Sequence, residues 1–543
     1  MIVRRALPTG LVTAPQAEAA FEGARVLERG GNAADAAVTA ALVQGVVDPH
    51  RCGLGGFGCI TVFFPEDGGA LAIDCHGRAG RHATPEQWSD LFIEAAADGF
   101  GYVVEGKVND VGYGSITVPG VVAGLAELHR RFGRLAWRDL VLAATSYATD
   151  GFLVPPPLAD FWRRPGLCGR VSTRERLGHT EAGRAITLKP DGEPYAAGEV
   201  FRQPLLAETY RRLAEEGPDA FYRGSIGEQI GCDWAQRGAL VTGEDLRAYR
   251  PDVGPPLAGR FRGHQVYTTP LPGGGVALLQ ALALLEQADV ARFGHNTPEY
   301  IDRVSRVLGA VWRDRLHLHG DPRFDGMTAE ELLAAPHLAR LEAGGDGGVE
   351  SGADSASTTQ ISIVDSDHNA VSLSHSLGYG SGVFHPELGF MFNNCMSAFD
   401  PRPGARNSIA PGKARSTAIA ETILLRDGLP LLVLGSPGAA RITAGLVQVI
   451  LNVVEFGMNA AEAVVQPRFD SYDDQIVLES RFPAPIVCEL ASRGWQPRQS
   501  AKPFGVVGRV YAIEAREDGP LVAGVDPGEP GAAFRGGERG PRA

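Results

Sequence analysis

The chain has 543 residues, of which 44% are hydrophobic and 21% charged, as expected for a globular protein. Its net charge of −13 argues against nucleic acid as a partner. The length allows two to four average domains or one large α/β domain. Two arginines near the start precede no apolar segment, and no run of 18 apolar residues follows, so we expect a cytoplasmic protein without a membrane span.

Cysteine and histidine give little support for a metal centre. The seven cysteines are scattered and include no Cys-x-x-Cys pair, a pattern that favours free thiols over disulfides or a zinc site. His317 and His319 are two positions apart, and no third ligand is close in sequence. A polar surface pair is the favoured interpretation, and we expect no metal.

Helical patterns dominate the first part of the chain. Helices are expected at 15–29, 33–44, 121–132, 137–150, 203–216, 225–237 and 276–287, and strands at 59–64, 69–74 and 260–269. The glycine-rich segment 51–58 precedes a strand and lacks the Gly-Lys-Ser/Thr of a phosphate loop, so it predicts a tight turn. The segment 166–199 is polar and is expected to be irregular.

Two alternating segments, 358–365 and 369–376, predict an antiparallel β-hairpin. If Asp365 pairs with Asn369, Thr358 lies opposite Ser376, so that two hydroxyls meet at the open end. The preceding segment, 342–357, is rich in glycine and small polar residues and is expected to be a mobile loop. An ordinary hairpin would also explain this pattern.

A mobile loop that meets a strand at a threonine also suggests self-cleavage between Ser357 and Thr358. The Thr358 hydroxyl would attack the preceding carbonyl, and hydrolysis of the resulting ester would free a new N-terminus. That threonine then carries the nucleophile and, in its α-amine, the base. An α-amine has a pKa near 8, so part of it is neutral at physiological pH.

The remaining segments predict strands at 421–425 and 431–434 and a helix at 441–456, separated by the turn Gly435–Ala440. Residues from about 529 to 543 are rich in Gly, Pro and Arg and are expected to be disordered. No repeat or linker divides the chain. The pattern favours helices that enclose central sheets in one domain.

Several motifs together resemble those of the γ-glutamyltranspeptidase family. They are Thr358-Thr359, Gly435-Ser436-Pro437-Gly438, the segment 30–38 (Gly-Gly-Asn-Ala-Ala-Asp-Ala-Ala-Val), and, in the family's order, 53–56, 118–120, 217–224, 245–246, 320–322, 393–394 and 467–469. The resemblance extends from about residue 10 to about residue 528. It implies an αββα N-terminal-nucleophile hydrolase, made as a proenzyme with a helix-rich segment 1–357 and a small segment 358–543 in one domain.

The resemblance also implies roles for individual residues. Thr358 is the nucleophile, Ser376 is the hydroxyl residue that contacts it, and the amides of Gly438 and Ala439 form the oxyanion hole. Because main-chain donors form such a hole, alanine is acceptable at 439 if its backbone conformation is accessible without glycine. A simple strand-to-helix turn is compatible with the same residues, since a helix N-terminus presents free N–H groups.

The departures from the family concern the substrate. Ala398 aligns with an aspartate that holds the glutamyl α-amine. A buried ammonium without a carboxylate partner costs several kcal/mol, so recognition of an amino-acid head group is expected to be lost. The positions expected to contact substrate are His76, where the family has an arginine, Arg78, Gly378, where it has an asparagine, Asn394, Arg415, Ser416 and Thr417. A structural role for His76 is an equal alternative.

The leading hypothesis is a self-processing amidohydrolase or acyltransferase that cleaves a small, carboxylate-bearing amide with water or an amine as acceptor. Family members that lack the residues binding the amino-acid head group resemble oxamate-type amidohydrolases and cephalosporin acylases. Two alternatives stay open: a true γ-glutamyl hydrolase or transpeptidase acting on glutathione-like substrates, and a catalytically impaired binding or scaffold protein. The resemblance implies no cofactor and no membrane partner; the two fragments would associate, and a further homodimer is compatible.

Overall fold

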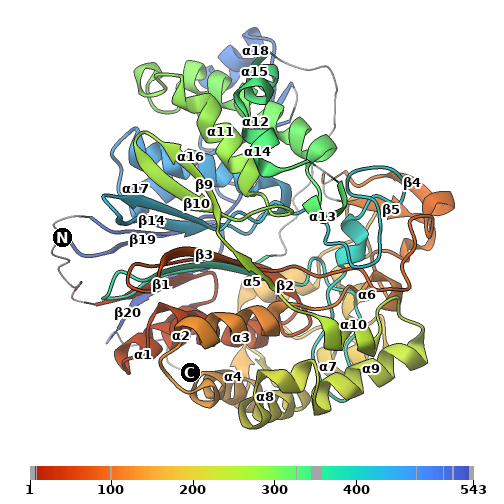
Figure 1. The fold of residues 1–543 in the computed structure, drawn as a ribbon. Helices are drawn as coiled ribbons and strands as arrows, with labels where there is room; N and C mark the ends of the chain where they lie inside the picture. Colours follow the sequence, from red (N-terminus) through yellow and green to blue (C-terminus); the bar gives the residue numbers. More distant parts are fainter. Residues whose placement is uncertain are drawn as a thin grey trace.

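The computed structural model describes residues 7, 9–97, 99, 101–325, 327–343, 358–472, 474–505, 507–516 and 519–536. Two antiparallel sheets face each other, and helices cover the outer face of each (Figure 1). This arrangement confirms the αββα architecture expected from the sequence. No helix in the described part of the chain is both long and apolar enough to span a membrane.

The first sheet has seven strands and contains the predicted hairpin at its centre. Its order is β20 (Ala532–Arg535), β1 (Leu11–Ala14), β11 (Ile361–Val364), β12 (Ala370–Ser376), β2 (Phe57–Phe64), β3 (Gly69–Cys75) and β8 (Asp252–Gly254). Apart from the edge strands, most residues of these strands are buried, because one face packs on helices and the other on the second sheet.

The second sheet has six strands. Its order is β19 (Val522–Val525), β18 (Tyr511–Glu514), β14 (Leu429–Gly435), β13 (Thr422–Arg426), β10 (His264–Thr268) and β9 (Leu257–Phe261). Apolar residues from both sheets meet between the layers; they include Leu11, Phe63, Val364, Ile423, Val433 and Ile513. The predicted pairing of β13 with β14 is confirmed.

The helices below the first sheet in Figure 1 are α1 (Ala17–Glu28), α2 (Ala33–Val47), α3 (Val121–Phe132), α4 (Trp137–Asp150) and α8 (Pro204–Glu216). α2 begins at Asn32, whose side chain accepts hydrogen bonds from the amides of Ala34 and Asp35. Every residue of α2 is buried, which explains its Ala- and Val-rich composition.

The layer that covers the second sheet consists of α11 (Gly275–Glu286), α12 (Pro298–Leu318), α14 (Ala329–Leu333), α15 (Ala335–Ala343), α16 (Ile442–Val454), α17 (Ala460–Val465) and α18 (Ala484–Ser492). A small sheet of β15 (Phe469–Tyr472), β16 (Gln475–Leu478) and β17 (Gln496–Gln499) accompanies it. The remaining elements are α5 (Pro156–Trp162), α6 (Thr173–Leu177), α7 (Glu181–Thr187), α9 (Ser225–Arg237), α10 (Gly243–Ala248), α13 (Pro322–Asp325), β4 (Phe92–Ala95) with β5 (Tyr102–Val104), and β6 (Phe152–Leu153) with β7 (Val200–Phe201).

Three expectations need correction. The single strand expected at 260–269 is a hairpin of β9 and β10, because Arg262 and Gly263 both have positive φ and reverse the chain. The irregular segment 166–199 contains α6 and α7, each begun by a hydroxyl cap. Residues 529–536 are ordered, since β20 pairs with β1 and Glu529 forms ion pairs with Arg51 and Arg509. The rest of that tail and residues 344–357 of the loop expected at 342–357 lie outside the described residues, whereas 342 and 343 are the last residues of α15.

Candidate active site

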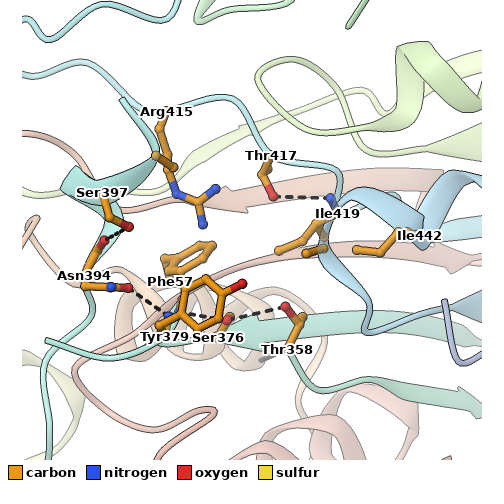
Figure 2. A pocket seen from close by; sticks show the side chains of 13 residues that line it. Phe57, Thr358, Ser376, Tyr379, Asn394, Ser397, Arg415, Thr417, Ile419 and Ile442 are labelled. Carbon is orange, nitrogen blue, oxygen red and sulfur yellow. Dashed lines mark hydrogen bonds between the residues drawn. The ribbon is translucent and has the colours of Figure 1, made fainter. Parts of the chain in front are cut away.

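The hairpin adopts the register expected from its sequence. Ile361 pairs with Leu373, and the same register continues to an isolated bridge between Thr358 and Ser376. The Thr358 hydroxyl donates to Ser376 Oγ over 3.5 Å, a long hydrogen bond that joins the two strands where they emerge from the sheet (Figure 2). Ser376 Oγ in turn accepts from the amide of Gly378 at 2.9 Å. The other half of the proposed cleavage site, Ser357, lies outside the described residues.

The turn between β14 and α16 brings Gly438 and Ala439 toward the hairpin. Gly438 has φ 147°, and a Cβ there would lie 2.8 Å from the Cα of Gly508, so the position requires glycine. Ala439 has φ 49°, in the left-handed region, and lines the pocket that contains Thr358. Within the described part of the chain, neither amide donates a hydrogen bond. Both N–H groups can therefore serve a ligand, at the cost of strain in Ala439.

Thr358 lies in a narrow pocket, whose free space is about 400 Å³ when the adjoining open solvent is included. Its lining comes from the first sheet, the loop after β12, the segment before β13, and the turn before α16 with the start of that helix: Phe57, Thr358, Ser376, Gly378, Tyr379, Asn394, Ser397, Ala398, Arg415, Thr417, Ile419, Ala439 and Ile442. The pocket brings together seven of the residues predicted for the site, namely Thr358, Ser376, Gly378, Asn394, Arg415, Thr417 and Ala439. Ser416 and Gly438 adjoin the lining in sequence.

The positive charge in this pocket belongs to Arg415. Its guanidinium lies 4.7 Å from the centre of the Phe57 ring, and its Nη1 donates to the carbonyl of Ser416 at 3.1 Å. The side chain is buried and points into the space in front of Phe57 (Figure 2). Among the residues that line the pocket, no other carries a charge. A buried guanidinium in this position suits a carboxylate, which it can bind with paired hydrogen bonds.

Asp110, an acid that contacts the pocket residue Asn394, is already paired with two arginines. Asn394 donates from its side chain to Asp110 at 3.1 Å. Arg176 approaches Asp110 to 2.7 Å and Arg170 to 3.6 Å. Although burial favours the neutral acid, these two guanidiniums hold the pKa of Asp110 below its usual value. Asp110 is therefore a poor partner for an additional ammonium, and the pocket lining itself contains no carboxylate.

His76 and Arg78 are not among the residues that line the pocket. His76 lies behind it, stacked on Phe57 with 5.8 Å between ring centres, and its Nδ1 is 2.5 Å from Asp74 Oδ1. Arg78 forms an ion pair with Asp252 at 2.8 Å. Direct contact of these two side chains with substrate is thus not supported. For His76, the alternative structural role fits better.

Cys59, Asp74 and His76 place ligand-type atoms within 4.8 Å of one another. One oxygen of Asp74 is already bonded to both the backbone amide and the ring of His76. Burial raises the pKa of the Cys59 thiol, so the thiolate needed as a metal ligand is disfavoured. These contacts fit a hydrogen-bonded support for Phe57 better than a metal site.

Sequence reasoning missed five lining residues: Phe57, Tyr379, Ser397, Ile419 and Ile442. Phe57 begins a strand that follows the glycine-rich turn, and its ring is buried beside Arg415. The amide of Tyr379 donates to Asn394 Oδ1 at 2.8 Å, which ties two walls of the pocket together (Figure 2). Proximity to the recognised motifs was the available signal, since Tyr379 and Ser397 each lie within three residues of a predicted position.

Two facing sheets enclosed by helices, with a threonine at the start of a central hairpin, define an N-terminal-nucleophile hydrolase. The family model of gamma-glutamyltranspeptidase matches residues 19–535, and the chain belongs to this family. It is therefore an enzyme of the amidohydrolase type.

Similar proteins include two proenzymes. The glutathione hydrolase proenzyme of Escherichia coli (strain K12) is 30% identical over 544 residues, which cover 95% of this chain and 90% of that protein. The acylase ACY 1 proenzyme of Pseudomonas sp. (strain SE83) is 31% identical over 533 residues, which cover 94% of this chain and 91% of that protein. Among solved structures, a cephalosporin acylase from Bacillus halodurans has a TM-score of 0.86 at 27% identity and covers 98% of this chain and 97% of that one.

Proposed function

We propose that the chain cleaves itself before Thr358 and then hydrolyses a small amide whose acyl group carries a carboxylate and no α-amine. The observation that carries this proposal is the charge of the pocket. Arg415 is buried at its wall, and no carboxylate lines it. The small side chain of Ala398 also faces this space. An acyl carboxylate would gain a partner there, whereas an ammonium would lose its water without replacement.

The chemistry follows from the groups around Thr358. After cleavage, its α-amine takes the proton of its own hydroxyl as the oxygen attacks the amide carbonyl. The amides of Gly438 and Ala439 stabilise the developing oxyanion. The protonated amine then gives its proton to the leaving nitrogen, and the acyl group stays on Thr358 as an ester. Water, or an acceptor amine, attacks this ester and frees the hydroxyl.

The test compares two anilides with the same leaving group, glutaryl and γ-glutamyl, which differ only in the α-amine. We expect kcat/KM to be about tenfold or more higher for the glutaryl compound, a difference of about 1.4 kcal/mol. Equal values, or a preference for the γ-glutamyl compound, would mean that the pocket contains an amine partner. Ala398→Asp should move the preference toward the γ-glutamyl compound. Arg415→Ala should raise KM for the glutaryl anilide while leaving the uncharged butyryl anilide unaffected.

A γ-glutamyl hydrolase is the second candidate, because the similar Escherichia coli protein is named a glutathione hydrolase. In that case the head-group amine would need a partner among the polar groups of the lining. Ser397 is the neighbour of Ala398 in the lining, although its hydroxyl already donates to the carbonyl of Asn394 at 2.9 Å. The anilide comparison separates the two candidates.

A further inference from the structure

A buried acid joins the two sheets beside the nucleophile hairpin. Glu421 immediately precedes β13, its side chain is fully buried, and its Oε2 lies 2.5 Å from the hydroxyl of Ser372 on β12. Its amide donates to Thr269 Oγ1 at 2.9 Å, which fixes its backbone to the second sheet. No step of the proposed reaction uses this carboxyl group.

The hairpin presents a row of polar pairs toward Glu421. Side chains two residues apart on a strand share one face, and the register places Ser362 opposite Ser372, with Gln360 and Ser374 one step closer to the nucleophile. Ser374 donates to Gln360 Oε1 at 2.8 Å, and Gln360 Nε2 donates to Ser372 at 3.0 Å. The next pair along this face is Thr358 and Ser376. Two residues of strand, about 7 Å, separate Ser374 from Ser376.

The hydrogen bonds of Ser372 indicate which form of Glu421 fits. A hydroxyl has one proton to donate. The carbonyl of Leu434, 3.0 Å away, can only accept, whereas Gln360 donates. All three contacts of Ser372 are satisfied together when its proton goes to Leu434 and the carboxylic acid of Glu421 donates to Ser372. The second oxygen of Glu421 has no hydrogen-bond partner among the described residues, which is tolerable for a neutral acid and costly for a carboxylate.

Among the described residues, no charged side chain compensates Glu421. The titratable group that acts on it from the first sheet is the Cys59 thiol of β2, whose pKa is raised by burial, so it is neutral. None of the ion pairs among the described residues includes Glu421. Burial raises the pKa of Glu421 to about 7, and its polar neighbours Ser372, Ser374 and Gln360 act against this rise.

We propose that Glu421 is a positioning residue that acts in its protonated form: it ties the polar face of the hairpin to the second sheet and so holds Thr358 in place against Ser376. When Glu421 ionises, the Ser372 proton turns to the carboxylate, Leu434 loses its donor, and the buried charge loosens the contact between the sheets. The inference rests on the proposed role of Thr358 as nucleophile.

The test uses Glu421→Gln, which keeps the shape and a donor and removes the titration. In the wild-type enzyme kcat should fall as pH rises through about 7. The ratio of kcat, variant to wild type, should therefore rise at least about tenfold between about pH 6 and about pH 9. A constant ratio would overturn the proposal.

Asp470→Asn is the matched control: Asp470 is also buried, with a pKa raised by burial to about 6, but it bonds to Tyr472 and not to the hairpin. Its ratio should stay constant.

A second variant keeps the proposal testable if Glu421→Gln does not fold. Ser372→Ala removes a hydroxyl that stabilises the ionised carboxylate and so lowers the pKa of Glu421, so the midpoint of the alkaline decline in kcat should move to higher pH. An unchanged midpoint would overturn the proposal.

Thermal unfolding separates this inference from the proposed function, because it needs no activity. A carboxyl group whose pKa is raised on folding stabilises the native state less as pH rises from its unfolded value, 4.5, to about 7. The Tm of Glu421→Gln relative to wild type should therefore rise over this range. If it rises while the kcat ratio stays constant, Glu421 is a protonated structural acid without a positioning role. If the Tm difference and the kcat ratio both change as expected while the active substrate is not a glutaryl amide, Glu421 keeps its positioning role, and only the proposed substrate class is wrong.

Discussion

Ala439 has a backbone conformation that residues other than glycine rarely adopt, at the turn that would hold the oxyanion. Its φ of 49° costs an L-amino acid about 1–2 kcal/mol. The neighbouring Gly438 has no such cost. Ala439 lines the pocket, and its amide binds the oxyanion in the mechanism proposed above, so the strain is located where it would serve that binding.

The variant Ala439→Gly should relieve this strain. Glycine also gains freedom in the unfolded chain, which costs about 0.4–1 kcal/mol, so the net free energy of unfolding should stay the same or rise by up to about 1.6 kcal/mol. Ala440→Gly is the matched control, because the adjacent residue has no positive φ and should lose about 0.5–1 kcal/mol. The measurement is Tm for both variants; a lower Tm for Ala439→Gly than for Ala440→Gly would contradict the strain.

The alternation of the hairpin and the family motifs were sufficient to predict Thr358, Ser376 and Arg415 as residues of the site. Phe57 and Glu421 could not be found in the same way. Each is a single residue whose position depends on how the two sheets face each other, and no periodic pattern marks such contacts. His76 does not line the pocket, and alignment along the chain could not reveal this, because its stacking on Phe57, whose ring also lies beside Arg415, depends on how the strands pack.

Among the elements, the hairpin positions Thr358. Alternation over two strands fixed both the existence and the register of β11 and β12, because a shift by one residue would turn every buried side chain to the opposite face. Weaker sequence signals did not predict the β9–β10 turn or strand β20. The β9–β10 turn has Arg262 and Gly263 without a preceding Asn or Asp, and β20 lies in a glycine-rich tail whose four residues pair because β1 offers a free edge.

Ser376→Ala tests the open end of this hairpin. The loss of one hydroxyl should cost about 1 kcal/mol of stability, so the chain should fold. Self-cleavage or turnover should nevertheless slow by about tenfold or more, because Thr358 loses the partner that orients its hydroxyl. Ser381→Ala is the control: its buried hydroxyl donates to Phe392 at 2.8 Å and does not touch Thr358. Equal rates of both steps in wild type and Ser376→Ala would show that the 3.5 Å contact has no role in positioning.

At the scale of the whole molecule, the segments before and after Thr358 are interleaved in one sheet. β1 lies between β20 and β11, and β2 lies beside β12. Strands from residues 1–357 therefore pair on both sides with strands from residues 358–543. Cleavage of one peptide bond leaves these hydrogen-bonded ladders and both helix layers intact, so the two fragments should remain one folded unit.

This arrangement gives the last prediction. Purified protein should separate on a denaturing gel into fragments of about 38 and about 20 kDa, in proportion to the 57.5 kDa of the chain, with Thr358 at the new N-terminus. The same sample should elute as one species in size-exclusion chromatography without denaturant, because separating the fragments would expose the edges of β1 and β2. Thr358→Ala should remain a single chain of unchanged fold, since the substitution removes only a hydroxyl and a methyl group at the end of the hairpin.

Thr359→Ala is the control, because the adjacent hydroxyl bonds to the carbonyl of His375 and should be dispensable for cleavage. Wild-type protein that stays intact, or that is cut at another bond, would exclude Thr358 as an N-terminal nucleophile.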